Sequence, residues 1–385
     1  MTKKITFLIN SLEAGGSERV VSLLANFLVK KYPVEIIVLE EGQFYRLDPA
    51  VKVTRLSCGP AKGWVQTLLL PILALKLKRY LRRYKISTLQ SHLYRANFVN
   101  IMAKLFGSPH TAQIVNAGTI SRYVGAGRKG KVNLFLISRL YPRADLVVWK
   151  SRGMEQDARR WIDPFPPSKV IYNPYDVELI QKLAREEVTE FEFNPSKRYL
   201  ISVGRLIKLK RHRDQILALT QLPEEVELIL IGRGEEEPHL RSLSHQLGVA
   251  HRVHFLGVQA NPFKFIARSH LLIHTSESEG FPNVVVEGLI CGVPAVVADC
   301  WSGPREILAP STSPTSLLPP DGELELGEYG LLFPVGAVSK LVEGVNLLFS
   351  NPSLYHHYRQ KGKERGEQFS IERIGRIYEK VLTDL

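Results

Sequence analysis

The stretch SESEGFPNVVVEGLICGVPAVVADC, residues 276–300, decides the fold of this chain. An apolar strand precedes it at Leu271–His274, and an apolar segment closes it at Pro294–Ala298. Between them residues 282–291 have a helical pattern, and Gly292 stands where a helix C-terminus favours a left-handed residue. Strand, helix and strand in this order form one βαβ unit, which predicts an α/β fold with doubly wound parallel sheets.

The start of this helix is expected to bind an anion. Pro282 suits a first helical turn, where the N–H that proline lacks would have no partner. The free amides and partial positive charge of a helix N-terminus attract phosphate. We therefore expect the loop and first turn to lie beside a bound phosphate, through Gly280, Phe281, Pro282 and Asn283.

Two glutamates accompany this anion site. Glu279 precedes the helix and Glu287 lies within it, about 8 Å further along at ~1.5 Å per residue. A carboxylate that faced a phosphate would be repelled, whereas one that faces sugar hydroxyls accepts their hydrogen bonds. The pair therefore suggests a nucleotide sugar, with one glutamate toward each sugar ring. The alternative is that one or both glutamates merely cap or solvate the helix.

Length and composition favour two ordinary globular domains. With 385 residues the chain can bury two cores, and its three cysteines have no metal-ligand spacing and fit a reducing compartment. The longest apolar stretch, Val65–Leu75, is much shorter than the roughly 20 residues that span a bilayer. The opening residues lead directly into a strand, so we predict no signal peptide and a cytoplasmic location.

Positive charge is concentrated in the first half of the chain. Residues 1–190 hold 30 Lys/Arg against 15 Asp/Glu, whereas residues 191–385 hold 21 against 23. Residues 49–144 contain 17 Lys/Arg and no acidic residue. Such a surface is expected to attract an anionic partner: membrane lipid, a diphosphate-linked substrate or nucleic acid. An ordinary basic solvated face is the alternative.

A glycine loop follows the first strand, Lys4–Ile9. The loop ends in Gly15-Gly16, and a helix is predicted from about Ser17. The pattern resembles a Rossmann opening without GxGxxG, and the paired glycines allow a ligand to approach the backbone closely. A plain tight turn is the alternative.

The next helical segment, residues 64–85, has an apolar front half and a basic back half. Membrane-surface helices have this composition, and each cation near an anionic leaflet contributes about 1 kcal/mol. We predict that the front packs on the protein and that the basic end meets the membrane; a merely solvated basic end is the alternative. The expected membrane-surface residues are Lys76, Lys78, Arg79, Arg82 and Arg83.

Candidate acceptor-side residues follow. His92 and Arg95 are predicted in a loop just before a helix, although a lone histidine in a loop is more often structural. The segment GAGRKGK, residues 125–131, satisfies both GxGxxG and GxxxxGK, but it does not follow a strand directly and lacks the Ser/Thr of a P-loop. We interpret it as a flexible basic loop that offers Arg128 and Lys129 to the acceptor or the membrane.

The second domain opens with the strand Tyr199–Val203. Arg205 and Lys210 follow it, one on each side of a turn, as a diphosphate clamp requires. Lys208 or Arg211 could share that role, and a solvated turn is the alternative.

These motifs resemble a known family. Glu279 and Glu287 around GFPNVVVE look like the E-x7-E motif of retaining GT-B glycosyltransferases of family 4. The continuation DCWSGPREIL, the opening GGSER and the GR-x4-K turn are similar to the same family. The resemblance implies two Rossmann-like domains facing each other across a cleft. We expect an N-terminal domain at 1–185, a linker at 186–198, a nucleotide-sugar-binding domain at 199–368 and a C-terminal helix at 369–385 that crosses back.

The resemblance also implies roles for the site residues. Glu287 would bind the ribose hydroxyls, Glu279 would lie beside the transferred sugar, and Gly15-Gly16 would border the donor diphosphate. Arg205 and Lys210 would neutralise the leaving diphosphate, with retention of anomeric configuration. The chain has no D-x-D pair and no HExxH, so we expect no metal and no cofactor. The family often carries a histidine where this chain has Asn116-Ala117, which leaves that acceptor-side group unassigned.

Looser similarities concern the substrates. LPILALKLKRYL, LISRLYPRADL and ANPFKFIA look like bacterial N-acetylgalactosaminyltransferases that extend undecaprenyl-diphosphate saccharides. We therefore expect transfer of N-acetylgalactosamine or another N-acetylhexosamine from a UDP-sugar to a polyprenyl-diphosphate-linked saccharide, at the cytoplasmic face of the inner membrane. A UDP-sugar epimerase of the same fold and a basic nucleic-acid-binding protein are the alternatives. We expect no nucleic-acid partner, because that reading would leave the glutamates and the clamp without a role.

Overall fold

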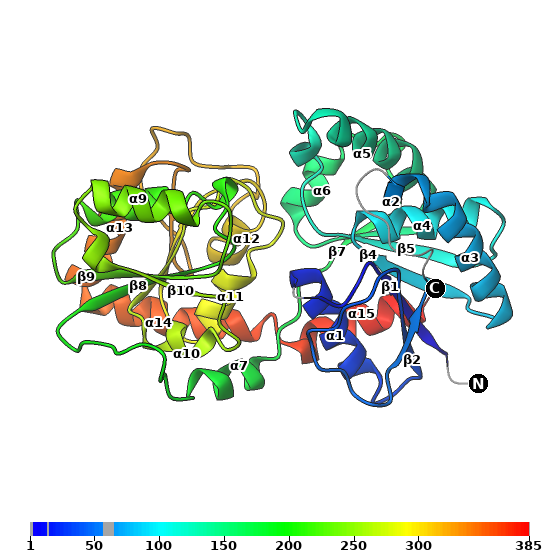
Figure 1. The fold of residues 1–385 in the computed structure, drawn as a ribbon, viewed down its shortest axis with the longest axis horizontal. Helices are drawn as coiled ribbons and strands as arrows, with labels where there is room; N and C mark the ends of the chain where they lie inside the picture. Colours follow the sequence, from blue (N-terminus) through cyan, green and yellow to red (C-terminus); the bar gives the residue numbers. More distant parts are fainter. Residues whose placement is uncertain (1–2, 14, 57–64, 385) are drawn as a thin grey trace. The chain divides into compact units, whose positions relative to one another are not determined.

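The computed structural model describes residues 3–13, 15–56 and 65–384, and the chain forms two compact units (Figure 1). The N-terminal unit comprises residues 1–175 and 370–385, and the C-terminal unit comprises residues 176–369. Ala14, Cys58 and Trp64, which belong to segments discussed above, lie outside the described residues. Cys291 and Cys300 are free thiols. Both units have the predicted α/β architecture.

The N-terminal unit is built on a sheet that has seven strands within the described residues, in the order β3-β2-β1-β4-β5-β6-β7, all parallel. Helices α3, α4 and α5 cover one face, and α1 and α15 cover the other (Figure 1). Because both faces are covered, the inner strands such as β1, β2 and β6 are buried, whereas the edge strands β3 and β7 are partly exposed. The elements are β1 (Ile5–Ile9), α1 (Gly16–Leu28), β2 (Val34–Val38), β3 (Lys52–Arg55), α2 (Val65–Leu68), α3 (Leu70–Arg83), β4 (Thr88–His92), α4 (Tyr94–Leu105), β5 (Thr111–Asn116), α5 (Gly127–Leu140), β6 (Leu146–Trp149), α6 (Arg152–Ala158), β7 (Ser168–Val170) and α15 (Ile371–Thr383).

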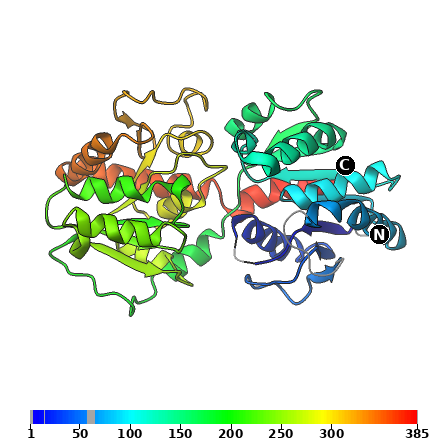
Figure 2. The same ribbon diagram turned by 45° about the horizontal axis from the view of Figure 1, so that its top comes forward.

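The C-terminal unit repeats this plan. Its described strands also form a sheet of seven, in the order β10-β9-β8-β11-β12-β14-β13, parallel except for β13. Helices α8, α9 and α13 lie together over one face, and α7, α10, α11 and α14 over the other, as Figure 2 also shows. The elements are α7 (Val177–Ala184), β8 (Arg198–Val203), α8 (His212–Leu219), β9 (Val226–Ile231), α9 (Glu237–Gln246), β10 (Val253–Gly257), α10 (Phe263–Arg268), β11 (Leu271–His274), α11 (Asn283–Ile290), β12 (Ala295–Ala298), α12 (Pro304–Leu308), β13 (Glu325–Leu326), β14 (Leu331–Phe333), α13 (Val338–Ser350) and α14 (Pro352–Glu367).

The boundary between the units lies earlier in the chain than the sequence suggested. The chain passes from one unit to the other at 175/176 and returns at 369/370, whereas the prediction placed a linker at 186–198. Helix α7 packs on α10 and α11 and so belongs to the C-terminal unit. At the return, the N–H of Ile371 donates to the carbonyl of Tyr175, 2.7 Å away, and α15 then packs on α1.

Two predicted segments of the N-terminal unit differ in the structure. The helix predicted over 64–85 is divided into α2 and α3, because Pro71 in the first turn of α3 lacks the N–H that would continue a helical hydrogen-bond ladder. Residues 125–131 were interpreted as a loop, but α5 already begins at Gly127. Positive φ angles of 76° at Gly125 and 64° at Gly127 turn the chain into that helix.

Candidate active site

Three side chains meet at the carboxyl end of the second sheet. Lys210 ends a short 3-10 turn (Lys208–Lys210) after β8, His274 ends β11, and Glu279 lies in the loop between β11 and α11. Lys210 Nζ forms an ion pair with Glu279 Oε1, and His274 Nε2 lies 2.8 Å from the same oxygen. Only 19%, 12% and 5% of the Lys210, Glu279 and His274 side chains are exposed. Neighbouring parallel strands therefore gather a cation, a carboxylate and an imidazole into one nearly buried cluster.

The charges in this cluster are fixed by their contacts. Burial raises the pKa of Glu279, but the Lys210 cation and the hydrogen bond from His274 outweigh that effect and hold the pKa of this carboxyl well below its usual range. Burial lowers the pKa of His274. At neutral pH, Glu279 is therefore ionised, and His274 is neutral and donates its Nε2–H to the carboxylate.

The two oxygens of Glu279 are used differently. Oε1 accepts from both Lys210 and His274. Among the described residues, Oε2 has no hydrogen-bond partner. A carboxylate that is anchored through one oxygen can accept a ligand hydroxyl through the other without losing its orientation.

The turn that carries Lys210 is tied to the end of β11. Thr275 Oγ1 donates to the carbonyl of Lys210 at 2.8 Å, and Gln215 Nε2 donates to that same hydroxyl at 2.9 Å. The N–H of Glu277 donates to the carbonyl of Leu209 at 2.9 Å. These contacts hold the cation and the carboxylate in register even though they are 69 residues apart in the sequence.

Arg205 is the other predicted clamp cation. Its side chain is exposed and forms no hydrogen bond or ion pair with the part of the chain that the structure describes. The backbone at this turn is crowded, because a Cβ on Gly232, whose φ is +142°, would lie 1.9 Å from the carbonyl oxygen of Gly204. Glycine at 232 therefore lets the β8 and β9 turns touch, and the arginine is left free to contact a ligand.

Helix α11 begins one residue later than predicted, at Asn283, with Pro282 as its N-cap. The preceding loop is braced by Ser302 Oγ, which donates to the carbonyl of Gly280 at 2.8 Å. Glu287 is buried inside α11. Glu279 and Glu287 thus lie on one loop–helix segment, the first beside Lys210 and the second within the helix.

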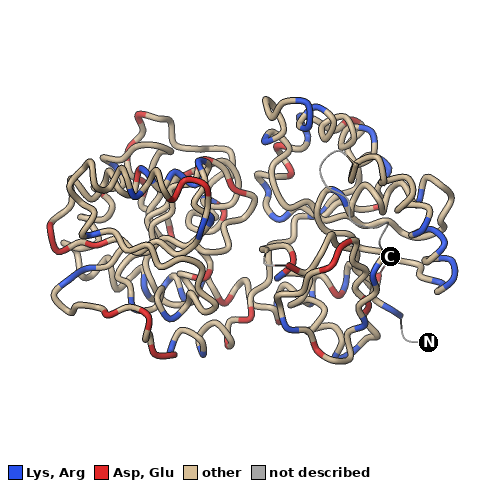
Figure 3. Tube along the Cα trace, in the orientation of Figure 1, with Lys and Arg blue, Asp and Glu red and all other residues tan. Residues whose placement is uncertain are grey.

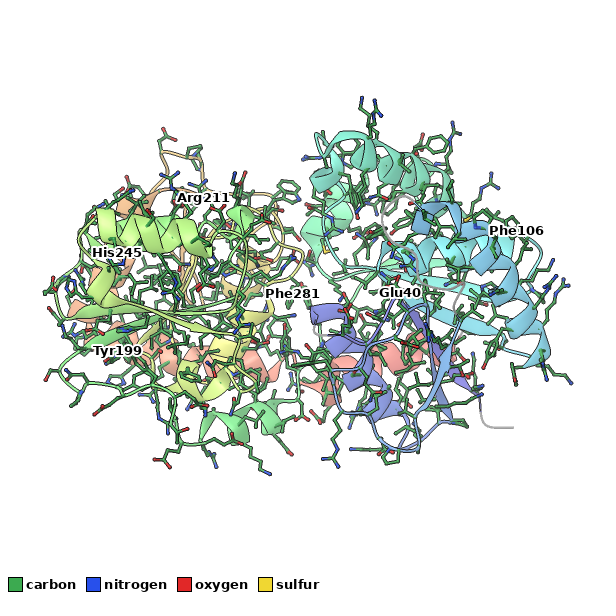
Figure 4. The ribbon with its side chains drawn as sticks, in the orientation of Figure 1. Glu40, Phe106, Tyr199, Arg211, His245 and Phe281 are labelled. Carbon is green, nitrogen blue, oxygen red and sulfur yellow. The ribbon has the colours of Figure 1, made fainter. Side chains whose placement is uncertain are left out.

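A cavity of about 480 Å³ lies beside the turn that carries Lys210, because Lys208 and Arg211 of that turn line it. His212 also lines the cavity, and its burial, with smaller contributions from His274 and Lys210, lowers its pKa to about 3. Arg211, labelled in Figure 4, ion-pairs with Asp214 at 2.7 Å. The lining residues are Ile207, Lys208, Arg211, His212, Arg213, Glu236, His239, Leu240 and Glu277.

Comparison with known proteins places this site in a family. The family model described as glycosyl transferases group 1 matches residues 184–365, and the glycosyl transferase 4-like domain matches residues 15–176. A Campylobacter jejuni protein named N-acetylgalactosamine-N,N'-diacetylbacillosaminyl-diphospho-undecaprenol 4-alpha-N-acetylgalactosaminyltransferase is 31% identical over 97% of this chain and 98% of its own. This chain is a group 1 glycosyltransferase.

Other similarities agree with this assignment. A second Campylobacter jejuni enzyme, named for adding alpha-1,4-N-acetyl-D-galactosamine to a GalNAc-GalNAc-diNAcBac-PP-undecaprenol, is 23% identical over 99% of each chain. Among solved structures, HepE of Anabaena with UDP has a TM-score of 0.78 at 22% identity, covering 99% of the glycosyltransferase and 100% of HepE. Sucrose-phosphate synthase of Thermosynechococcus elongatus reaches 0.82 at 18% identity over the whole of both chains. The glycosyltransferase therefore has the GT-B fold, as its sequence implied.

The residues that were expected on the acceptor side lie in different environments from those predicted. His92 was expected in a loop, but it ends the central strand β4, is 1% exposed and packs edge-on against Phe7. Burial lowers its pKa well below the usual range. Arg95 lies in the first turn of α4 and ion-pairs with Glu40, labelled in Figure 4, at 2.5 Å.

Arg128 and Lys129 of α5 are exposed. Neither has a hydrogen-bond or ion-pair partner in the described ranges.

The basic helix α3 uses its cations in two ways. Lys78 donates to the carbonyl of Phe106, and Arg82 donates to that of Gly107 at 2.7 Å, so both satisfy the C-terminus of α4. Arg79 and Arg83 are exposed and have no hydrogen-bond partner within the described residues. The fifth expected membrane-surface residue, Lys76, is exposed.

The apolar front of this segment was predicted to pack on the protein, but part of it is exposed. Leu68, Ile72 and Leu75 are exposed beside the cations. Figure 3 shows lysine and arginine along α3 and α5 of this unit.

Sequence reasoning missed His274 and His212. His274 closes the apolar strand LLIH and looked like part of the core. The available signal was its position at the carboxyl end of a strand, five residues before Glu279, where parallel α/β sheets place ligand-binding groups. Within the described residues, no cluster of His, Cys, Asp and Glu is suited to hold a metal ion.

Proposed function

We propose that the enzyme is a retaining transferase that moves a sugar from a UDP-sugar to a polyprenyl-diphosphate-linked saccharide. The observation that carries this proposal is the Lys210–Glu279–His274 cluster: a diphosphate-binding cation and a hydroxyl-binding carboxylate in contact at one edge of a doubly wound sheet. A nucleotide sugar presents a diphosphate next to sugar hydroxyls, and so it needs both groups within a few ångströms of each other.

Each residue has a role in this mechanism. Glu279 accepts a hydroxyl of the transferred sugar through Oε2, and Glu287 accepts the ribose hydroxyls. Arg205, Lys210 and the amides from Gly280 to Pro282 stabilise the charge that develops on the departing UDP. The family resemblance implies that Gly15 and Gly16 also border the donor diphosphate. His274 holds Glu279 as an ionised acceptor.

The family resemblance implies the stereochemistry. A diphosphate whose charge is neutralised leaves without protonation by a carboxylic acid, so no carboxylic acid has to lie beside the leaving oxygen. The acceptor hydroxyl attacks from the face on which UDP departs, a phosphate oxygen takes its proton, and the configuration is retained. No metal is required, because Arg205 and Lys210 supply the positive charge.

The acceptor is proposed from two observations. The relatives from Campylobacter jejuni are named for acceptors linked to undecaprenol through a diphosphate, and both names give N-acetylgalactosamine as the transferred sugar. Helix α3 exposes Ile72 and Leu75 beside Arg79 and Arg83, which suits the surface of an anionic membrane. Among the described residues, no helix is both long and apolar enough to cross a bilayer. We therefore propose peripheral binding at the cytoplasmic face of the inner membrane.

A product-mass assay tests the proposal. The enzyme is incubated with a panel of UDP-sugars and a short polyprenyl-diphosphate disaccharide, with EDTA present. Growth of the acceptor by one N-acetylhexosamine, with UDP released and the new linkage alpha by NMR, is the expected result. UDP-sugar consumed without a longer acceptor would indicate an epimerase or hydrolase instead, and no reaction with any donor would remove the proposed function.

A further inference from the structure

A buried lysine of the N-terminal unit has almost no partner. Lys150 follows β6 directly and is 3% exposed. Its one hydrogen bond within the described residues is a long one, from Nζ to Ser17 Oγ at 3.4 Å. Burying an ammonium without a close counter-ion costs free energy, so we expect an anion to offset that cost at Lys150.

The lysine reaches the start of a helix that is suited to anions. Ser17 lies in the first turn of α1, a helix of 13 residues whose N-cap, Gly15, offers no side-chain cap. The first amides of a helix and its positive dipole end favour a bound anion. Lys150 adds a full positive charge to that end from a different element.

An internal carboxylate already lies at this position. The Glu18 side chain folds back over the start of its own helix, so that a Cβ on Gly15 would lie 2.2 Å from Glu18 Oε2. Burial raises the pKa of Glu18, while hydrogen bonds from the backbone N–H groups of Glu18 and Ser17 and the Lys150 charge oppose that rise. The first turn of α1 thus binds an anion in this structure, and that anion is a side chain that can move.

We propose that Lys150, the Ser17 hydroxyl and the first turn of α1 form an anion site that binds a diphosphate group, which displaces the Glu18 carboxylate. Diphosphate is the chemistry to expect here, because both proposed substrates carry one. This assignment of the source rests on the proposed function, whereas the existence of the site does not. Gly15 and Gly16 at the start of α1 already have an expected role beside the donor diphosphate; the new assignments are Lys150, the Ser17 hydroxyl and the displacement of Glu18. Arg205 and Lys210 belong to the C-terminal unit.

The surroundings of Lys150 make the binding sensitive to pH. Burial lowers the pKa of Lys150 to about 8, and the Glu18 charge partly opposes this. His92 on β4 is buried and neutral, and Glu13 acts on Glu18 from the loop before α1. A bound diphosphate favours the ammonium form and raises this pKa, so affinity is full below pH 8 and falls as the pH rises above it.

Calorimetric titration of inorganic pyrophosphate into the full chain tests the site without turnover. All proteins carry Arg205→Met to weaken the other clamp. Lys150→Met is expected to lose about tenfold in affinity, as for one charge-assisted hydrogen bond, and Lys150→Arg to keep most of it. Lys30→Met, at an exposed position two residues beyond the end of α1, is the matched control. Equal affinities of the Lys150→Met and Lys30→Met proteins would overturn the proposal.

Two further measurements guard against a folding artefact. Glu18→Gln removes the competing anion and is expected to tighten pyrophosphate binding at pH 6.5; a loss as large as that of Lys150→Met would contradict the displacement. Between pH 7 and 9, affinity is expected to fall more steeply with Lys150 than with Lys150→Arg, and comparing the two cancels the titration of pyrophosphate itself. Parallel pH profiles would also overturn the proposal, even if Lys150→Met failed to fold.

Steady-state kinetics then identify the source of the diphosphate. A raised KM for the lipid-linked acceptor in Lys150→Met assigns the site to the acceptor, and a raised KM for the UDP-sugar assigns it to the donor. Unchanged KM values for both would contradict a role in this reaction. If the wild-type enzyme transfers no sugar at all, the proposed function fails, while the pyrophosphate titration still decides whether the anion site exists.

Discussion

The two units have the same kind of sheet but treat positive charge in opposite ways. In the C-terminal unit, Lys210 is paired with Glu279, and His274 contacts the same carboxylate. In the N-terminal unit, 96 residues in succession, 49–144, contain no carboxylate, and the cations of α3 and α5 lie along its surface (Figure 3). Arg95 and Lys104 of this interval pair with Glu40 and Asp145 from outside it. The exposed Arg79, Arg83, Arg128 and Lys129 have no ion-pair partner within the described residues and are available to an external anion, whereas the paired Lys210 is proposed to position Glu279 for a sugar. The contrast suggests that one unit orients the donor and the other receives an anionic acceptor or surface.

The largest expected effect comes from breaking the Lys210–Glu279 ion pair in the C-terminal unit. Glu279→Ala removes the hydroxyl acceptor and leaves Lys210 nearly buried beside no carboxylate. We expect transfer to fall on the order of 1,000-fold, the upper range for removing one preorganised polar group from an active site. Initial rates from product mass give the comparison. Glu237→Gln is the control: Glu237 begins α9, is partly buried and ion-pairs with Arg241, and its variant is expected to keep full activity. A mild loss in Glu279→Ala would contradict the role of Glu279.

Removing the cation of the same pair should change the pH dependence as well as the rate. Lys210→Met is expected to lower the rate on the order of 100-fold. Lys210 is the largest influence that lowers the pKa of Glu279, so its loss lets burial raise that pKa. Activity needs ionised Glu279 and disappears as the pH falls through its pKa, so the acid limb of the rate profile moves to higher pH. An unshifted limb would show that Glu279 does not titrate in the active site.

The contrast within the N-terminal unit can be tested on α3 alone. Arg79→Gln with Arg83→Gln removes two exposed cations and should weaken binding to anionic vesicles by about 2 kcal/mol, or roughly 30-fold, without changing Tm. Lys78→Gln with Arg82→Gln removes the two cations that satisfy the end of α4 and should lower Tm by a few degrees, about 1–2 kcal/mol of unfolding free energy. Vesicle sedimentation and thermal melts separate the two pairs. If the two double variants changed vesicle binding and Tm to the same extent, the cations of α3 would not be divided between membrane binding and stabilising the end of α4.

The smallest expected effect comes from replacing His274, the third member of the cluster. His274→Phe removes the second donor to Glu279 and should lower kcat about tenfold, as for one hydrogen bond to a charged group. His274→Gln retains an N–H donor and should recover most of that loss. Because His274 acts through Glu279, its loss should also raise the pKa of Glu279 and move the acid limb of the rate profile to higher pH. A rate loss of the same size in both variants, with unchanged pH profiles, would reduce His274 to a packing residue.

Much of the fold and part of the site could be predicted from the sequence. Strand β6 and strand β11 occur at the predicted residues, because short apolar runs between polar loops specify buried parallel strands. The GT-B fold was implied by the family resemblance that Glu279, Glu287 and the motifs around them carry. That Lys210 and Glu279 share one site was implied by the motifs, but their direct ion pair was not, since sequence spacing does not show which loops touch.

The errors have physical causes. His274 ends an apolar strand and Lys150 directly follows one, so hydropathy marks both as the edge of a core and gives no sign of ligand chemistry. The division of the basic helix before Leu70 depends on Pro71, whose effect was outweighed by the apolar pattern around it. The start of α5 was hidden by Gly125 and Gly127, which look like loop residues although the second already belongs to the helix.

The most direct test of the central claim is a calorimetric titration of UDP into the wild-type enzyme and into the Arg205→Met, Lys210→Met double variant. The account predicts that UDP binds the wild-type protein without added metal. It predicts a loss of at least about tenfold in the double variant, because two charge-assisted contacts to the diphosphate are removed together. Equal affinity of the two proteins for UDP would contradict the account, because the edge of the second sheet would then not be the donor site.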